Sequence, residues 1–130
     1  MTLQEYDKQM DEATDKLRTN WSEELYHFVS EFQYKGMTEL LATYKKTIGN
    51  DEAKQVCYDL LEYAVKYSES GSSIVDVETK ELADRVGEII MDEIGDFLLD
   101  PPEIYEFNDG WSIDCMFGGR YVPYWDGWRD

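Results

Sequence analysis

Residues 77–100 read VETKELADRVGEIIMDEIGDFLLD, and this stretch decides the fold. Its apolar residues recur at steps of three and four, which places them on one face of a helix. That face consists of Leu82, Val86, Ile89, Ile90, Ile94, Phe97 and Leu98. The pattern predicts one long amphipathic helix against which the rest of the chain packs, and Asp76 or Thr79 can cap its start.

A row of carboxylates runs beside this apolar face. Its members recur at four-residue steps, and we name them the acidic rail: Asp84, Glu88, Asp92, Asp96 and Asp100. At a rise of ~1.5 Å per residue, neighbouring members lie about 6 Å apart along the helix axis. Like charges at that spacing destabilise a helix by ~0.2–0.5 kcal/mol per pair. Folding therefore does not explain the rail, which indicates a binding role.

Glu93 stands apart from the rail because a helical projection places it on the apolar face, between Ile90 and Phe97. A carboxylate there loses water, so it needs a hydrogen-bonding or charged partner. We predict that Glu93 is less exposed than Asp92 or Asp96, and that a Lys, an Arg or a Tyr hydroxyl contacts it.

Two helical patterns open the chain. Thr2 begins a capping box, and the apolar rhythm after it predicts a helix over residues 3–18. Asn20 is the predicted cap of a second helix, which Gly36 ends. The buried stripe predicted for this second helix is Trp21, Leu25, Phe28, Val29 and Phe32.

Two more helices are predicted before the long one. A short helix covers residues 38–49, and a longer one covers 50–67 with Asn50 as its cap. Residues 68–73 (SESGSS) form a loop by composition. Residues 74–77 are either a short strand or an apolar lead-in to the long helix.

Prolines at 101–102 end the long helix, and the apolar period then changes from 3.6 to 2. Turn residues at 108–110 and 118–119 bound a central strand. Its alternating apolar residues share one side and are Trp111, Ile113, Cys115 and Phe117. Residues 103–107 and 120–125 are the predicted flanking strands.

These patterns predict an α+β fold, with four to five helices followed by a C-terminal three-stranded antiparallel β-meander packed on them. The chain has 130 residues, which suits a single domain over 1–130. Its helical part is 1–100 and its β-meander is 103–128. A chain of this size buries roughly two thirds of its unfolded surface, enough for a core without further support.

The charge of the chain limits its partners. Its 29 acidic and 12 basic residues give a net charge of −17, and residues 71–130 hold 15 acidic against 4 basic residues. Such a protein repels nucleic acid and anionic membranes and attracts basic surfaces. We therefore expect a basic protein as partner, and no direct contact with nucleic acid or membrane. The alternative is an acidic surface that serves only solubility.

The start of the chain is polar, and no stretch approaches the ~20 apolar residues of a membrane span. These features favour a cytoplasmic protein. Cys57 and Cys115 lie inside apolar patterns without metal-ligand spacing, so we expect two buried, reduced thiols.

Glu24 and His27 form a Glu-x-x-His unit, which is half of a ferritin-type di-iron site. His27 is the only histidine, so the second unit is missing. The same count leaves no Ser-His-Asp or Cys-His triad. The sequence thus predicts no metal, no cofactor and no nucleophilic catalysis.

Four carboxylates resemble a magnesium site in their spacing. Glu78-x-x-Glu81 followed by Glu93-x-x-Asp96 is similar to the pattern of all-helical MazG-like nucleotide pyrophosphatases. In that family the two halves lie on facing helices and hold Mg²⁺ against a triphosphate, whereas here both fall on one predicted helix. The resemblance implies a Mg-dependent nucleotide hydrolase, which remains an alternative.

The acidic rail resembles, at the level of class, the DNA-mimic inhibitors that phages and mobile elements encode. A DNA strand presents one phosphate per ~3.4 Å of axis, and the rail is a sparser line of negative charge. The resemblance implies a non-catalytic inhibitor that occupies the basic nucleic-acid-binding surface of a target, in an anti-CRISPR or anti-restriction role. The alternative is an immunity protein or antitoxin that blocks a cationic nuclease toxin.

The residues predicted to contact the partner combine charge with aromatic anchors. They are Glu81, Asp84, Glu88, Asp92, Asp96, Asp100, Tyr124 and Trp128. Carboxylates steer a basic partner, and Tyr and Trp dominate binding energy at interfaces. The sequence leaves the oligomeric state open.

Overall fold

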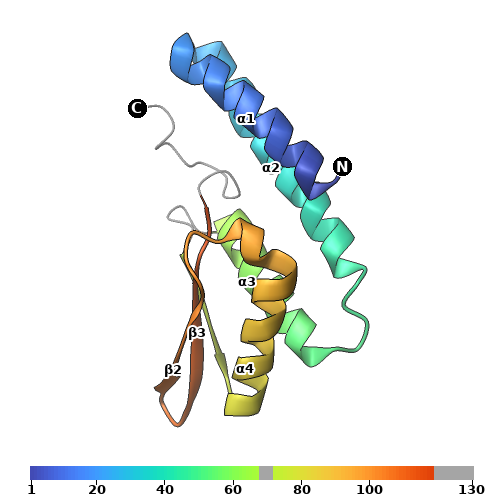
Figure 1. The fold of residues 1–130 in the computed structure, drawn as a ribbon, viewed down its shortest axis with the longest axis vertical. Coiled ribbons are helices and arrows are strands. Elements are labelled where there is room, and N and C mark those ends of the chain that lie inside the picture. Colours follow the sequence, from blue (N-terminus) through green and yellow to red (C-terminus); the bar gives the residue numbers. More distant parts are fainter. Residues whose placement is uncertain (68–71, 119–130) are drawn as a thin grey trace.

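The computed structural model describes residues 1–67 and 72–118, except for the side chain of Tyr67. Within these ranges it contains four α-helices and a three-stranded antiparallel sheet, which confirms the predicted α+β class. The elements are α1 (Leu3–Thr19), α2 (Glu23–Lys45), α3 (Glu52–Tyr67), β1 (Ser72–Val77), α4 (Lys80–Ile89), β2 (Glu103–Phe107) and β3 (Gly110–Met116). Helices α1 and α2 form a long arm, and α3 and α4 lie beside the sheet (Figure 1).

Side-chain caps set where the first helices begin. The hydroxyl of Thr2 accepts the N–H of Glu5, as the predicted capping box requires. At α2 the cap is Ser22, whose hydroxyl accepts the N–H of Leu25, and not the predicted Asn20. A serine two residues further on provides the same extended backbone and acceptor oxygen, so the helix begins there.

Gly36 does not end a helix, contrary to the prediction. Helix α2 runs through it to Lys45, so residues 38–45 of the predicted short helix belong to α2, whereas residues 46–49 lie in the turns after it. A Cβ atom at Gly36 would lie 2.6 Å from the ring of Tyr6. The glycine is therefore needed for close approach of α1, not for a turn.

The buried stripe of α2 is narrower than predicted. Val29 is fully buried, but Trp21 is 43% exposed and Phe28 is 60% exposed. Along the arm, α1 is the helix of the described chain that packs on α2, so α2 has one neighbour there to bury its apolar residues. The predicted stripe assumed a wider contact than one helix provides.

Helix α3 begins at Glu52 because Asp51 caps it. One carboxylate oxygen of Asp51 accepts the N–H groups of Ala53 and Lys54, at 3.0 and 3.4 Å. The predicted cap, Asn50, lies one residue too early. This detail places the other oxygen of Asp51 toward α4, where it takes part in the site described below.

The sheet has the order β1-β3-β2, and β3 is antiparallel to both neighbours. Strands β1 and β2 are therefore parallel to each other and are joined through α4, as parallel strands require a long crossover. Strands β2 and β3 belong to the predicted meander. The third strand of the described sheet is β1 at Ser72–Val77, so residues 74–77 are a strand and not a lead-in, and β1 takes the place beside β3 that we assigned to residues 120–125. Residues 120–125 lie outside the described part of the chain.

The β2–β3 hairpin is as predicted. Asn108 and Asp109 form its two-residue turn with φ of 50° and 64°, and Phe107 pairs with Gly110. Two positive φ values are typical of a type I′ turn, which suits Asn and Asp. Ile113, Cys115 and Phe117 are buried and Trp111 is half-buried, which confirms the predicted inward side of β3. Of the predicted turn at 118–119, only Gly118 is described.

The stretch that decides the fold is helical, though over a shorter span than 77–100. Val77 ends β1, and the hydroxyl of Thr79 caps α4 by accepting the N–H of Leu82. A π-helical turn (Ile90–Ile94) and a 3₁₀ turn (Gly95–Phe97) follow α4 directly. The predicted apolar face is buried, with Leu82 and Leu98 at its half-buried edges.

The helical stretch ends at Phe97, before the prolines, because the chain there joins the sheet. The N–H of Leu99 donates to the carbonyl of Met116 at 2.9 Å, and the N–H of Gly118 donates to the carbonyl of Phe97 at 2.7 Å. These bonds hold the end of the helical stretch at the end of β3.

Candidate partner-binding site

Four members of the acidic rail lie on the solvent side of α4 and of the two turns that follow it. Asp100, predicted on the same helix, lies beyond Phe97, where the helical stretch ends. All five of its members are exposed, and so is Glu81. The two aromatic residues predicted to join them, Tyr124 and Trp128, lie outside the described residues. The rail is therefore open to a partner along its full length.

The basic residues nearest the rail in sequence contact residues outside the rail. Residues 72–118 hold 13 acidic residues and two bases, Lys80 and Arg85. The ammonium of Lys80 lies over the ring of Trp111, 5.8 Å from its centroid. The guanidinium of Arg85 donates to Asp51 at 2.7 Å and holds the pKa of that carboxyl below its usual value. Among residues 1–67 and 72–118, no Lys or Arg forms an ion pair with the rail.

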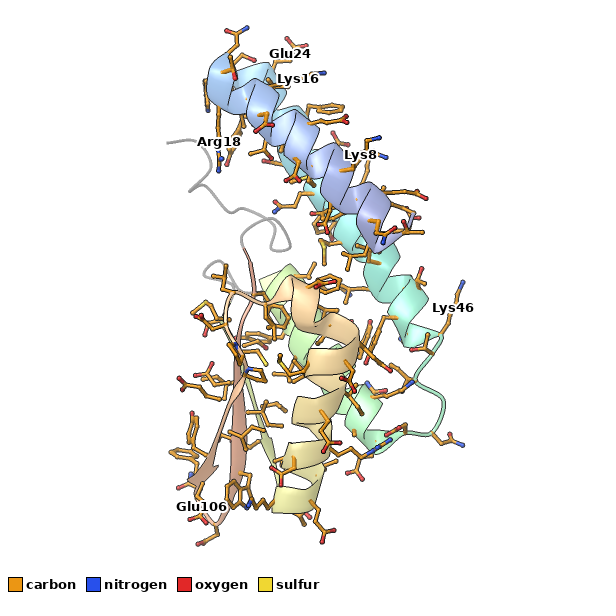
Figure 2. All side chains as sticks on the ribbon, in the orientation of Figure 1. Lys8, Lys16, Arg18, Glu24, Lys46 and Glu106 are labelled. Carbon is orange, nitrogen blue, oxygen red and sulfur yellow. The ribbon has the colours of Figure 1, made fainter. Side chains whose placement is uncertain are left out.

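The remaining bases leave the molecule with an uneven charge. Figure 2 shows Lys8, Lys16 and Arg18 projecting from α1 on the arm, and Lys46 at the end of α2. Glu106 projects from the sheet at the opposite end of the molecule (Figure 2). The arm thus mixes charges of both signs, whereas the body formed by α4 and the sheet is strongly negative. Such a field attracts a basic partner to the body in preference to the arm.

Successive rail carboxylates of the helical stretch shift gradually in angle around its axis. Four residues of an α-helix advance by about 400°, so Glu88 lies ~40° further round α4 than Asp84. The π-helical turn at Ile90–Ile94 closes its hydrogen bonds one residue later, which reduces this shift between Glu88 and Asp92. The turn therefore helps to keep the carboxylates on the face that solvent reaches.

An open groove of about 620 Å³ runs beside the rail, between the helical stretch and the start of β2. Three rail carboxylates line one side of it: Asp84, Glu88 and Asp92. The other lining residues are largely apolar and are Gly87, Met91, Pro101, Pro102 and Ile104. The groove thus combines negative charge with apolar surface, and its size lies in the range of ligand pockets.

Gly87 brings the two sides of the groove together. It is buried, and a Cβ atom there would lie 2.9 Å from Cδ1 of Ile104. The absence of a side chain lets β2 approach α4, so that Ile104 packs on the helix backbone. We did not predict this groove, although Met91 was a signal: it is an apolar residue among the carboxylates, outside the apolar face of the helix.

Glu93 has both kinds of partner that its position predicts. It accepts a hydrogen bond from the hydroxyl of Tyr44 at 3.2 Å, and the ammonium of Lys54 lies 3.4 Å from its other oxygen. Its side chain is 36% exposed, so it lies at the boundary of the core and not outside it. Burial, with Cys57 and Glu93 nearby, raises the pKa of Tyr44, so its hydroxyl remains a donor. Glu93 therefore ties α2 and α3 to the π-helical turn.

We expect the contacts of Glu93 with Tyr44 and Lys54 to stabilise the folded protein. Glu93→Ala removes the acceptor of Tyr44 and the partner of Lys54, and should lower the free energy of unfolding by about 1–2 kcal/mol. Glu93→Gln keeps an acceptor oxygen and should cost less, ~0.2–1 kcal/mol, as for a partly exposed ion pair. Urea denaturation measures both, with Asp92→Asn as the exposed control. Equal stability of Glu93→Ala and Asp92→Asn would contradict the assignment.

The carboxylates of the hydrolase alternative do not gather in one place. Glu81, Glu93 and Asp96 follow one another along a single helical stretch, and Glu93 faces Tyr44 and Lys54. In the described ranges, no group of three or more His, Cys, Asp or Glu side chains is placed to hold a metal ion. His27, on the arm, is 70% exposed and lies 3.7 Å from Glu23.

The two cysteines are buried, free thiols, as predicted. Burial raises the pKa of Cys57 to about 12 and that of Cys115 to about 12. The sulfur of Cys57 donates to the carbonyl of Val86 at 3.6 Å. Neither thiol is activated as a nucleophile, since the thiolate is the reactive form.

We expect both thiols to react only when the chain unfolds. A pKa of about 12, against 9.0 for an ordinary cysteine thiol, leaves roughly 1000-fold less thiolate at pH 8. The folded chain also holds these protons more tightly than the unfolded chain. Stability from this source is thus complete below pH ~9 and declines as pH rises further. Alkylation along a urea gradient, read by mass spectrometry, should follow global unfolding; rapid labelling of the native protein would contradict this.

Comparison with known proteins gives no significant match to a protein-family model, a curated protein or a solved structure. Within the described residues, no helix combines the length and the apolar character that crossing a membrane requires. The site is therefore interpreted from its own geometry and charge.

Proposed function

We propose that the protein is a non-catalytic inhibitor that binds the basic nucleic-acid-binding surface of a target protein, with the acidic rail in place of DNA phosphates. An anti-CRISPR or anti-restriction protein of a phage or mobile element has this function. Targets of this kind act inside the cell, so we place the protein in the cytoplasm.

The observation that supports this proposal is the unpaired state of the rail. A solvated helix face usually mixes signs and gains ion pairs. Here the ammonium of Lys80 lies over the ring of Trp111 and Arg85 donates to Asp51, the cap of α3, so the rail keeps its charge. Like charges at four-residue steps oppose helix formation, and they therefore need a reason other than folding.

Electrostatic attraction would bring the partner to the rail, and apolar contact would then stabilise the complex. The negative body speeds encounter with a basic surface, and carboxylates take the positions of phosphates along it. Charge alone gives an association that high salt weakens, so apolar contact is needed for a lasting complex. The groove beside the rail offers that contact.

The proposal is tested by capture and competition. The immobilised protein is incubated with host lysate at low and high salt, and captured proteins are identified. DNA or RNA binding by each captured protein is then measured with and without an equimolar amount of the inhibitor. We expect nucleic acid to be displaced. A captured protein that keeps its nucleic acid, and so binds both partners at once, would contradict mimicry.

A further inference from the structure

We propose that the groove beside the acidic rail binds a basic amphipathic α-helix of the target, with one large apolar side chain of that helix seated against Met91, Pro102 and Ile104. The inference rests on the proposed function for the basic character of the partner. It adds which kind of segment is recognised and where its apolar residue lies.

The two sides of the groove demand two kinds of side chain. Asp84 and Glu88 are exposed and without an ion pair to any Lys or Arg of the described chain, so they favour cations. Met91 is 51% exposed and lines the same groove, as do two prolines. A purely polar cationic segment would leave this apolar surface in water. A segment with bases on one side and an apolar residue on the other satisfies both.

Spacing favours a helix as the occupant. Carboxylates of α4 recur at about 6 Å, and bases at i and i+4 of a partner helix recur at the same distance. Asp84 and Asp92 are eight residue steps apart, ~12 Å at the rise of an α-helix, which is the length of about two helical turns. Some helices that bind DNA, such as the basic regions of bZIP and bHLH proteins, are rich in basic residues and lie in the major groove. The same helix can therefore meet phosphates on DNA or carboxylates here.

The groove is held in shape before binding. Ile104 packs on the backbone of α4 at Gly87, and prolines 101–102 restrict the chain that enters β2. The bonds from Leu99 and Gly118 anchor the segment between helix and sheet. A preformed groove loses little conformational entropy when it is filled, which leaves more of the contact energy for affinity.

Three synthetic peptides test the groove directly. The first is a helix-forming peptide with Lys or Arg at i and i+4 and a Leu at the position that faces the groove. The second has Ser in place of that Leu, and the third has a Pro that breaks the helix at constant charge. We expect the first to bind about 10- to 100-fold more tightly than the second, from burial of one Leu, and also more tightly than the third. Equal binding of the first and second would overturn the apolar seat, and equal binding of the first and third would overturn the helix.

A substitution in the groove distinguishes the contribution of apolar contact to peptide affinity from that of charge. Met91→Glu adds a negative charge to the rail face but removes the apolar seat. If charge alone bound the peptide, affinity would rise; we expect it to fall about 10-fold or more. Phe28→Glu, at an exposed apolar residue on the arm, is the matched control and should leave the affinity unchanged. A rise for Met91→Glu would overturn the inference.

The peptide assay contains no nucleic-acid-binding enzyme, so the two proposals can fail separately. If the groove binds the first peptide with the expected selectivity while the whole protein displaces no nucleic acid from any captured target, the groove stands and the mimicry fails. If nucleic acid is displaced but the peptides do not differ, the mimicry stands and this inference fails.

Discussion

Neutralising the acidic rail should slow association with the basic target by about 10- to 1000-fold at low salt, the range that electrostatic steering contributes. The variant combines Asp84→Asn, Glu88→Gln, Asp92→Asn and Asp96→Asn. It should also lose most of the dependence of the association rate on salt. Stopped-flow association kinetics with the captured target, at two salt concentrations, measure both quantities.

The same variant should fold at least as well as the native chain. It removes three like-charge pairs at four-residue steps, each worth ~0.2–0.5 kcal/mol, so stability should hold or rise by about 1 kcal/mol. A loss of binding therefore cannot be assigned to unfolding. The matched control removes four exposed carboxylates from the arm, through Glu5→Gln, Glu12→Gln, Asp15→Asn and Glu24→Gln. If the rail serves only solubility, both variants will bind alike and the rail variant will precipitate more readily.

Measurements of nucleotide turnover and Mg²⁺ binding distinguish the proposed role of the rail from the hydrolase alternative. If the protein were a Mg-dependent nucleotide hydrolase, Asp96→Asn alone would remove Mg²⁺ binding and nucleotide turnover. The changes at Asp84, Glu88 and Asp92 would then be nearly silent. Under the proposed function, no single member of the rail dominates, and the effect grows with the number of charges removed.

Gly36→Ala should destabilise the protein by about 1–3 kcal/mol, the usual cost of overpacking a close contact. The new Cβ atom would lie 2.6 Å from two ring carbons of Tyr6, which is fully buried and stacks on Phe32. The ring cannot move aside without disturbing the contact between α1 and α2. Alanine is otherwise the better helix former by ~1 kcal/mol, so a net loss identifies the clash.

The control for this substitution is Gly95→Ala, which adds the same methyl group in the 3₁₀ turn. Its Cβ would lie 3.7 Å from the nearest atom, the carbonyl oxygen of Ile90, which is ordinary contact. We expect unchanged or slightly higher stability there. Thermal and urea unfolding compare the two. If Gly36→Ala instead stabilised the protein, the close contact with Tyr6 would be refuted, and Gly36 would behave as an ordinary position inside a helix.

Features that depend on neighbours in the chain could be predicted from the sequence. The cap at Thr2, the turn at Asn108 and Asp109, and the inward side of β3 are set within a few residues. The apolar face of the long helical stretch follows from the period of its residues. The rail was visible for the same reason, because exposure on one face of a helix is a matter of spacing.

Glu93 shows where prediction from sequence stops. Its position on the apolar face predicts that it needs a donor or a cation, since a partly buried carboxylate must recover the interactions it had with water. That the partners are Tyr44 and Lys54, from two other helices, depends on how α2 and α3 pack.

Only the tertiary structure decided three further features. These are the role of Gly36 as a contact with Tyr6, the place of β1 beside β3, and the approach of Ile104 to Gly87 that forms the groove. Each joins segments far apart in the chain, and a glycine or a short apolar run has the same local pattern whether it ends an element or packs against one. Periodicity and capping are local and readable from the sequence, whereas the choice among distant partners is made by packing, which minimises empty space and exposed apolar surface over the whole molecule at once.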